Sequence, residues 1–78
     1  MINSKYQVHI LLGLMSGPKS IRTIMINRDI PFTKATYMIT ALKNLIIEGN
    51  LEILSSSNDT ISLDNVYKLT DKVTVTEL

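Results

Sequence analysis

Residues 33–48 combine short polar and cationic side chains with apolar residues at helical spacing, and this combination could contact the bases and phosphates of DNA. An α-helix fits the major groove, where polar and aromatic side chains contact base edges and flanking cations contact phosphates. The side chains expected to contact bases are Thr33, Thr36, Tyr37 and Thr40. The side chains expected to contact phosphates are Lys19, Arg22, Arg28, Lys34, Lys43 and Asn44. A helix that starts at Thr33 would add backbone donors for a further phosphate.

The charged residues are distributed unevenly along the chain, although the formal net charge of the 78 residues is only +1. Residues 1–47 hold six Lys and Arg against one acidic residue, a net charge of +5. Residues 48–78 hold two Lys against six acidic residues, a net charge of −4. Such an asymmetry favours a polyanionic partner, and the basic part coincides with the residues expected to contact DNA.

The residue types that most enzymes and metal sites require are scarce. The chain has no cysteine and one histidine, and it contains neither a glycine-rich phosphate loop nor a His-Glu-x-x-His metal motif. The acidic residues are scattered, so the sequence predicts no enzyme, no catalytic residue, no metal site and no cofactor. His9 is expected to be a hydrogen-bonded core or boundary residue. Met15, Met25 and Met38 are expected to pack in the core.

The chain length and the hydropathy predict one domain, residues 1–78, in the cytoplasm. Chains this short bury only about 60% of the surface that their unfolded form exposes, so a partner subunit often adds stability. The longest apolar run, residues 8–15, is shorter than the ~18 residues that a membrane-spanning helix needs. The first residues lack the pattern of a secretory signal. The sequence therefore favours a soluble protein without a membrane partner.

Three segments predict helices. Residues 5–16 carry apolar side chains on more than one face and predict a largely buried helix. Residues 20–28 predict a shorter helix capped by Ser20, and residues 33–48 predict a third helix capped by Thr33. Glycines after the first and third segments predict their ends. The apolar stripe of the third helix consists of Ala35, Met38, Ile39, Leu42, Leu45 and Ile46.

After Gly49 the pattern changes from helical spacing to alternation, which is typical of β-strands. The predicted strands cover about residues 51–56, 60–63 and 66–70, and they form a two- or three-stranded antiparallel hairpin. The tail, residues 73–78, has the β-branched composition of a strand, although a terminus can also fray. Three helices followed by this hairpin predict an α+β fold with the layout of a winged helix-turn-helix.

Three segments, in order over about residues 8–72, carry a family resemblance. They are Ile10-Leu11-Leu12-Gly13-Leu14-Met15-Ser16-Gly17-Pro18, Ala41-Leu42-Lys43-Asn44-Leu45-Ile46-Ile47-Glu48-Gly49-Asn50-Leu51 and Tyr67-Lys68-Leu69-Thr70-Asp71-Lys72. The chain thereby resembles the PadR and MarR groups of winged-helix transcription regulators, in a minimal version without their C-terminal dimerisation helix. The resemblance implies a sequence-specific regulator of repressor type, whose third helix enters the major groove of double-stranded DNA.

The predicted wing and the tail carry acidic residues, among them Asp59 and Asp64. Because phosphates repel carboxylates, the DNA interface is expected on the second and third helices and not on the wing. The acidic residues also support a second interpretation, a winged-helix protein-interaction module. Such a module, for example a phage- or plasmid-type accessory or inhibitor protein, would bind a protein partner through its acidic wing or tail.

The small size predicts a homodimer, since two half-sites on DNA would raise the affinity and the specificity of a module with few cations. Either residues 73–78, pairing as an edge strand, or the apolar surface of the first helix would form the dimer contact.

Overall fold

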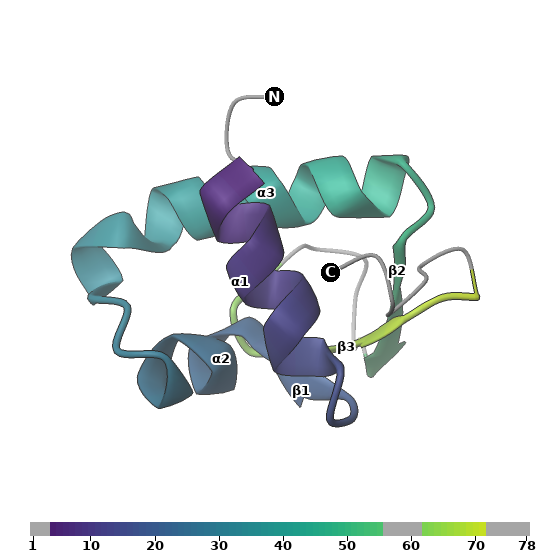
Figure 1. Cartoon of the computed structure of the whole chain (residues 1–78), viewed down its shortest axis with the longest axis horizontal. Coiled ribbons are helices and arrows are strands. Elements are labelled where there is room, and N and C mark those ends of the chain that lie inside the picture. The colour runs from purple at the N-terminus through teal and green to yellow at the C-terminus, as the bar shows by residue number, and fades with distance from the viewer. Residues whose placement is uncertain (1–3, 56–61, 72–78) are drawn as a thin grey trace.

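The apolar residues at helical spacing form α-helices and the alternating residues after them form strands (Figure 1). The computed structural model describes residues 4–55 and 62–71. In chain order its elements are α1 (Ser4–Leu14), β1 (Lys19–Ser20), α2 (Ile21–Asn27), the 3₁₀ helix η1 (Phe32–Lys34), α3 (Ala35–Ile47), β2 (Leu51–Ser55) and β3 (Val66–Leu69). Three α-helices and a three-stranded antiparallel sheet in this part of the chain confirm the predicted α+β class. No helix among these residues has both the length and the apolar character needed to cross a membrane.

The start of α2 and the end of α3 follow the predicted signals. The Ser20 hydroxyl accepts a hydrogen bond from the backbone N–H of Thr23, at 3.1 Å, and so caps α2. After α3, Gly49 has a left-handed φ of 82°, which favours glycine. The N–H of Asn50 then donates to the carbonyl of Leu45 at 2.9 Å, which satisfies a carbonyl in the last turn of the helix.

α1 ends at Leu14, two residues earlier than predicted. Met15, Ser16 and Gly17 form a turn, in which the N–H of Gly17 donates to the carbonyl of Leu14 at 3.1 Å. This turn redirects the chain toward β1. Met15 therefore lies outside the helix and is 40% exposed, so the prediction that it packs in the core is wrong.

Thr33 does not cap α3, and this prediction is also wrong. Thr33 lies inside η1, and the residue before α3 is Lys34, whose side chain makes no capping hydrogen bond. The N–H groups at the start of the helix are bonded to backbone carbonyls instead. The N–H of Lys34 donates to the carbonyl of Pro31 at 2.9 Å, and the N–H of Ala35 donates to the carbonyl of Phe32. A tight 3₁₀ turn thus takes the place of a side-chain cap.

The sheet has the strand order β1-β3-β2, with β3 between two antiparallel neighbours. β2 and β3 form the predicted hairpin, in which Glu52 pairs with Lys68 and Ile53 pairs with Tyr67. The register is irregular between Ile53 and the last residue of β2, as in a β-bulge. The tail, residues 73–78, lies outside the described residues.

The third strand is β1, and not the predicted segment 60–63. β1 pairs with β3 on the side opposite β2. Ser62 and Leu63 belong to no strand, and residues 60 and 61 lie outside the described part of the chain. The carbonyl of Leu63 accepts a hydrogen bond from the N–H of Arg22 at 3.0 Å. This contact holds Leu63 against the start of α2.

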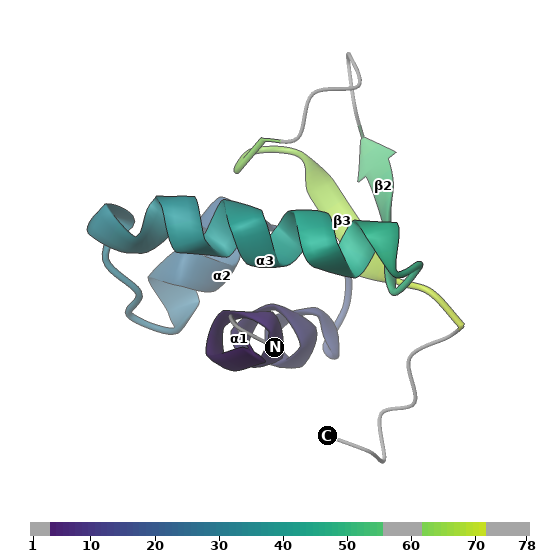
Figure 2. The same ribbon diagram turned by 90° about the horizontal axis from the view of Figure 1, so that it is seen from above.

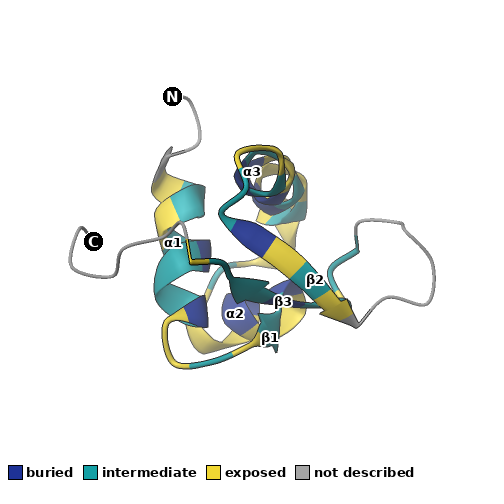
Figure 3. Ribbon diagram, turned by 90° about the vertical axis from the view of Figure 1, so that its right-hand side faces the viewer, coloured by how far each residue is buried: buried dark blue, intermediate teal, exposed yellow. Residues whose placement is uncertain are grey.

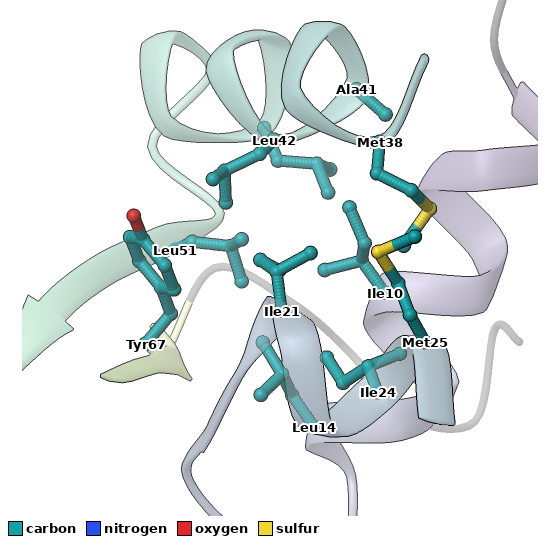
Figure 4. Close-up of a cluster of buried hydrophobic side chains, with 11 residues drawn as sticks. Ile10, Leu14, Ile21, Ile24, Met25, Met38, Ala41, Leu42, Leu51 and Tyr67 are labelled. Carbon is teal, nitrogen blue, oxygen red and sulfur yellow. The ribbon is translucent and has the colours of Figure 1, made fainter. Parts of the chain in front are cut away.

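The helices and the sheet share one hydrophobic core (Figures 3 and 4). Its buried members are Ile10, Leu14, Ile21, Ile24, Met25, Met38, Ala41, Leu42, Leu45, Leu51 and Tyr67. The predicted stripe of α3 is confirmed, because Met38, Leu42 and Leu45 are buried and its other members pack against the core. Met25 and Met38 also occupy the core positions that the sequence predicted.

α1 is only partly buried, although the sequence predicted a largely buried helix. Ile10 and Leu14 face the core, whereas Val8 is 43% exposed. Figure 2 shows α1 end-on and gives the reason, since α2 and α3 both lie on the same side of it. The other side of α1 therefore keeps apolar residues at the surface.

The hydroxyl of Tyr67 ties the chain before β3 to the core. It donates to the carbonyl of Ser62 at 3.0 Å and accepts from the N–H of Ser62 at 3.2 Å. Because Tyr67→Phe keeps the ring but removes the hydroxyl, the N–H and the carbonyl of Ser62 lose their hydrogen-bond partner, and we expect the free energy of unfolding to fall by about 1–3 kcal/mol. Urea denaturation followed by circular dichroism measures this loss. An unchanged free energy of unfolding would show that water satisfies both groups equally well.

Candidate nucleic-acid interface

Most of the side of α3 turned away from the core is open in the described residues, and only Tyr6 of α1 covers one edge of it, at Tyr37 (Figure 2). Thr36, Tyr37 and Thr40 are exposed on this side, at helical spacing. Thr33 is also exposed, but it lies in η1 just before the helix. The structure thus brings three of the four predicted base-contacting residues onto one helix face and places the fourth next to it.

Two side chains on this face have contacts within the protein. The ring of Tyr37 stacks on that of Tyr6 from α1, with centroids 5.6 Å apart and an interplanar angle of 11°. Tyr37 is still 50% exposed, so half of its surface remains accessible. The hydroxyl of Thr40 donates to the carbonyl of Thr36 at 3.1 Å and keeps its own lone pairs as acceptors. The stack holds Tyr37 in one orientation relative to the helix.

Two lysines flank this face. Lys34 ends η1, and its Nζ lies 5.5 Å from the centroid of the Tyr37 ring. Lys43 is exposed in the second half of α3, next to the half-buried Asn44. Within the described part of the chain, neither lysine forms an ion pair with a carboxylate. No carboxylate of the described residues therefore neutralises either ammonium group.

Arg22 is already paired. Its Nε donates to Oδ1 of Asp64 at 2.6 Å and its Nη2 donates to Oδ2 of the same carboxylate at 3.3 Å. The guanidinium also lies over the ring of Phe32, 5.3 Å from the centroid. The hydrogen bond with Asp64 raises the pKa of Arg22, and the same bond lowers the pKa of the Asp64 carboxyl. A DNA phosphate would have to compete with Asp64 for this predicted phosphate contact.

Lys19 does not join the group around α3. It lies in β1, which Figure 1 shows at the opposite edge of the molecule from α3. Its Nζ donates to the hydroxyl of Ser16 at 2.6 Å and to the carbonyl of Gly17 at 3.4 Å. Lys19 thus closes the turn after α1, a role that its spacing in the sequence did not show.

Arg28, directly after α2, is joined to His9 of α1. The Nε of Arg28 donates to Nδ1 of His9 at 2.9 Å, which confirms that His9 is a hydrogen-bonded boundary residue. This bond needs a neutral imidazole that carries its proton on Nε2. Burial, together with the positive charges of Arg28 and Lys5, lowers the pKa of His9 below its ordinary value of 6.5. All three effects favour the neutral form.

The lowered pKa of His9 predicts a pH dependence of stability. Since the unfolded state binds more protons, the stability contributed by His9 is present above about pH 6.5 and is lost as the pH falls through the lower folded pKa. We expect acidification from neutral pH to shift the urea midpoint of the wild-type protein more than that of His9→Gln. Other titrating groups contribute equally to both proteins. Identical pH dependences would contradict this assignment.

A basic pocket joins two predicted phosphate contacts, Arg28 and Lys34, to polar residues outside the predicted set. The pocket, called the α1–η1 pocket from here on, has a volume of about 230 Å³. Its polar lining comes from Lys5, Tyr6, His9, Arg28, Asp29 and Lys34. The sequence contained one indication of this pocket, because Lys5 and His9 lie four residues apart and so share a helix face. Nothing in the local sequence indicated that the turn after α2 would close the pocket.

The acidic residues that supported a protein partner are described only in part. Asp64 forms an ion pair with Arg22, and Glu52 forms one with Lys68 at 3.5 Å. Residues 56–61 and 72–78 lie outside the described residues.

Among residues that the structure describes, no three His, Asp or Glu lie together in a way that could hold a metal ion. Comparison of the chain with protein-family models, curated proteins and solved structures found no match.

Proposed function

We propose that the protein is a sequence-specific transcriptional regulator of repressor type that binds double-stranded DNA with a winged helix-turn-helix fold. α2, the turn through η1 and α3 have the order of a helix-turn-helix, and β2 and β3 would be the wing. α3 would enter the major groove as the recognition helix. The arrangement of three helices and a three-stranded sheet is compatible with this assignment.

The outer face of α3 carries the proposal. Thr36, Tyr37 and Thr40 lie on its open side, and two lysines without carboxylate partners in the described residues flank them. Neither η1 nor α3 contains an acidic residue, and the carboxylate of Glu48 follows only at the C-cap of α3, after the last of these side chains. A helix face that only keeps a protein soluble usually mixes both signs of charge. The absence of acidic residues therefore favours a polyanion as the partner.

We further propose that the active form is a homodimer on two half-sites about one helical turn of DNA apart. A single module with so few cations would bind weakly, and joining two modules raises the effective affinity. The open apolar side of α1, which includes Val8, would supply the contact. Light scattering of the wild-type protein and of Val8→Glu tests this arrangement, and a monomeric wild-type protein would contradict it.

A titration with random-sequence duplex DNA at several salt concentrations tests the proposed function. Fluorescence anisotropy of a labelled duplex gives the binding constant. Each phosphate that the protein neutralises should contribute a slope of about −0.9 to log K against log salt concentration. We expect a slope that corresponds to several phosphates. The absence of measurable binding at low salt would overturn the proposal and favour a protein partner.

Substitutions on α3 and η1 should separate affinity from sequence preference. Lys34→Ala and Lys43→Ala should weaken binding almost uniformly across sequences, because each would remove a phosphate contact. Thr36→Ala and Tyr37→Ala should change which sequences are preferred, because these residues would contact bases. Selection of bound duplexes from a random pool reports both effects and gives the half-site spacing. Equal loss of affinity in all four variants, with one unchanged preference, would contradict base reading by α3.

A further inference from the structure

The α1–η1 pocket collects positive charge from three separate elements. Lys5 lies near the start of α1, Arg28 follows α2 directly, and Lys34 ends η1. One carboxylate, that of Asp29, also lines the pocket. Cations therefore outnumber carboxylates by three to one around a single concave site.

None of these three cations has a carboxylate partner in the described part of the chain. The ion pairs there join Arg22 to Asp64 and Lys68 to Glu52 instead. Like charges around a concavity concentrate their field, because the walls of the pocket displace water that would screen them. An anion in the pocket would relieve this repulsion. The charge distribution therefore favours a negatively charged ligand.

His9 positions the guanidinium of Arg28 at the wall of the pocket. The Nε–H of Arg28 is donated to Nδ1 of His9 at 2.9 Å. The Nη groups of Arg28 and the Nε2–H of His9 have no hydrogen-bond partner among the described residues. A guanidinium held in this way presents a rigid fork of donors, which matches two oxygens of one anion. The pocket thus contains an oriented donor as well as two flexible lysines.

We propose that the α1–η1 pocket binds a phosphate group. A phosphate presents several oxygens around one centre and can accept hydrogen bonds from a guanidinium, an imidazole and two ammonium groups together. A carboxylate has only two oxygens in one plane and would leave donors unused. The remaining volume, lined by the ring of Tyr6 and by Ile30 and Pro31, would receive part of the molecule that carries the phosphate.

Two sources can supply this phosphate. The first is the DNA backbone, because Lys34 belongs both to the pocket and to the flank of α3, and Tyr6 in the pocket stacks on Tyr37 of α3. This source rests on the proposed function. The second is a small molecule with a phosphomonoester, which would occupy the same pocket without DNA.

Titration of the full chain with inorganic phosphate, followed by NMR, tests the proposal. Sodium chloride at equal ionic strength is the reference. We expect saturable shifts of the His9 ring and of the backbone amides of Arg28 and Lys34. Arg28→Gln should weaken phosphate binding about tenfold, because it removes charge-assisted hydrogen bonds. Lys68→Gln removes the same charge from β3, outside both the pocket and the predicted DNA contacts, and should leave phosphate binding unchanged.

Two results would overturn the proposal. One is the absence of saturable shifts in the wild-type protein. The other is an equal loss of phosphate binding in Arg28→Gln and Lys68→Gln, which would indicate attraction to net charge only. Arg28 is exposed, so its substitution should leave the core intact, and the amide spectrum checks this. Lys5→Gln removes a second cation of the pocket and should also weaken phosphate binding.

Competition with duplex DNA identifies the source. If a backbone phosphate occupies the pocket, saturating duplex abolishes the shifts that phosphate causes at His9, and Arg28→Gln weakens duplex binding more than Lys68→Gln does. If a free phosphomonoester is the ligand, the phosphate shifts persist on the DNA complex and glycerol phosphate reproduces them. Both results support a phosphate site in the α1–η1 pocket. A protein that shows the phosphate shifts but binds no duplex contradicts the proposed function alone.

Discussion

Leu42→Ala is expected to lower the free energy of unfolding by about 2–5 kcal/mol, because it leaves a cavity in the centre of the core. Leu42 is fully buried, and Figure 4 shows it on the side of α3 that faces the core. A single core in a chain of this size rarely supplies more than about 3–5 kcal/mol of stability. The substitution should therefore leave a large fraction of the protein unfolded without denaturant.

Ile47→Ala is the matched control for this prediction. Ile47 lies in the same helix and also loses an aliphatic side chain, but it is 80% exposed. The expected change in its free energy of unfolding is within about 0.5 kcal/mol. Urea denaturation followed by circular dichroism measures both variants. Similar losses in the two proteins would show that α3 does not bury the side on which Leu42 lies.

The helices could be predicted because their signals are local. The stripe of α3 repeats over several turns, and Ser20 lies within three residues of the N–H that it caps. The strands were less predictable, since pairing depends on residues far away in the sequence. β1 is only two residues long, and it is a strand because it pairs with β3. The carbonyl of Leu63, in contrast, accepts a hydrogen bond from the N–H of Arg22, and Leu63 belongs to no strand. No local pattern distinguishes these two cases.

The candidate interface could be predicted where one helix carries it. Thr36, Tyr37 and Thr40 are exposed together because the buried stripe fixes the orientation of α3. The α1–η1 pocket could not be predicted, because Lys5, Arg28 and Lys34 come from three elements whose packing brings them together. Contacts of this kind depend on the angles between helices, which the spacing of residues within one helix does not determine.

The basic and the acidic parts of the sequence are not fully separated in the folded structure. The first 47 residues carry a net charge of +5 and the remaining residues −4, but the ion pair of Arg22 with Asp64 joins the two parts across 42 residues. It places a carboxylate of the acidic part at the start of α2, inside the proposed interface. If the protein binds DNA as proposed, Asp64 would oppose this binding in two ways, by repelling phosphates and by occupying Arg22.

Asp64→Asn is accordingly expected to strengthen duplex binding about tenfold, since Arg22 could then form charge-assisted hydrogen bonds with a phosphate. The slope of log K against log salt concentration should steepen by about 0.9, which corresponds to one additional phosphate. The ring of Phe32 would keep the guanidinium at the surface of the interface. Because exposed ion pairs contribute little to stability, the variant should remain folded. The salt titration with random-sequence duplex measures both quantities.

Glu52→Gln separates the release of Arg22 from a change in net charge. It also removes one negative charge from an exposed ion pair, that of Glu52 with Lys68, but it leaves Arg22 bound to Asp64. If Arg22 contacts a phosphate, only Asp64→Asn steepens the salt dependence. Equal gains in the two variants would mean that net charge alone sets the affinity. Unchanged affinity in both would place Arg22 outside the interface, so that the lysines that flank α3 would have to hold the DNA backbone.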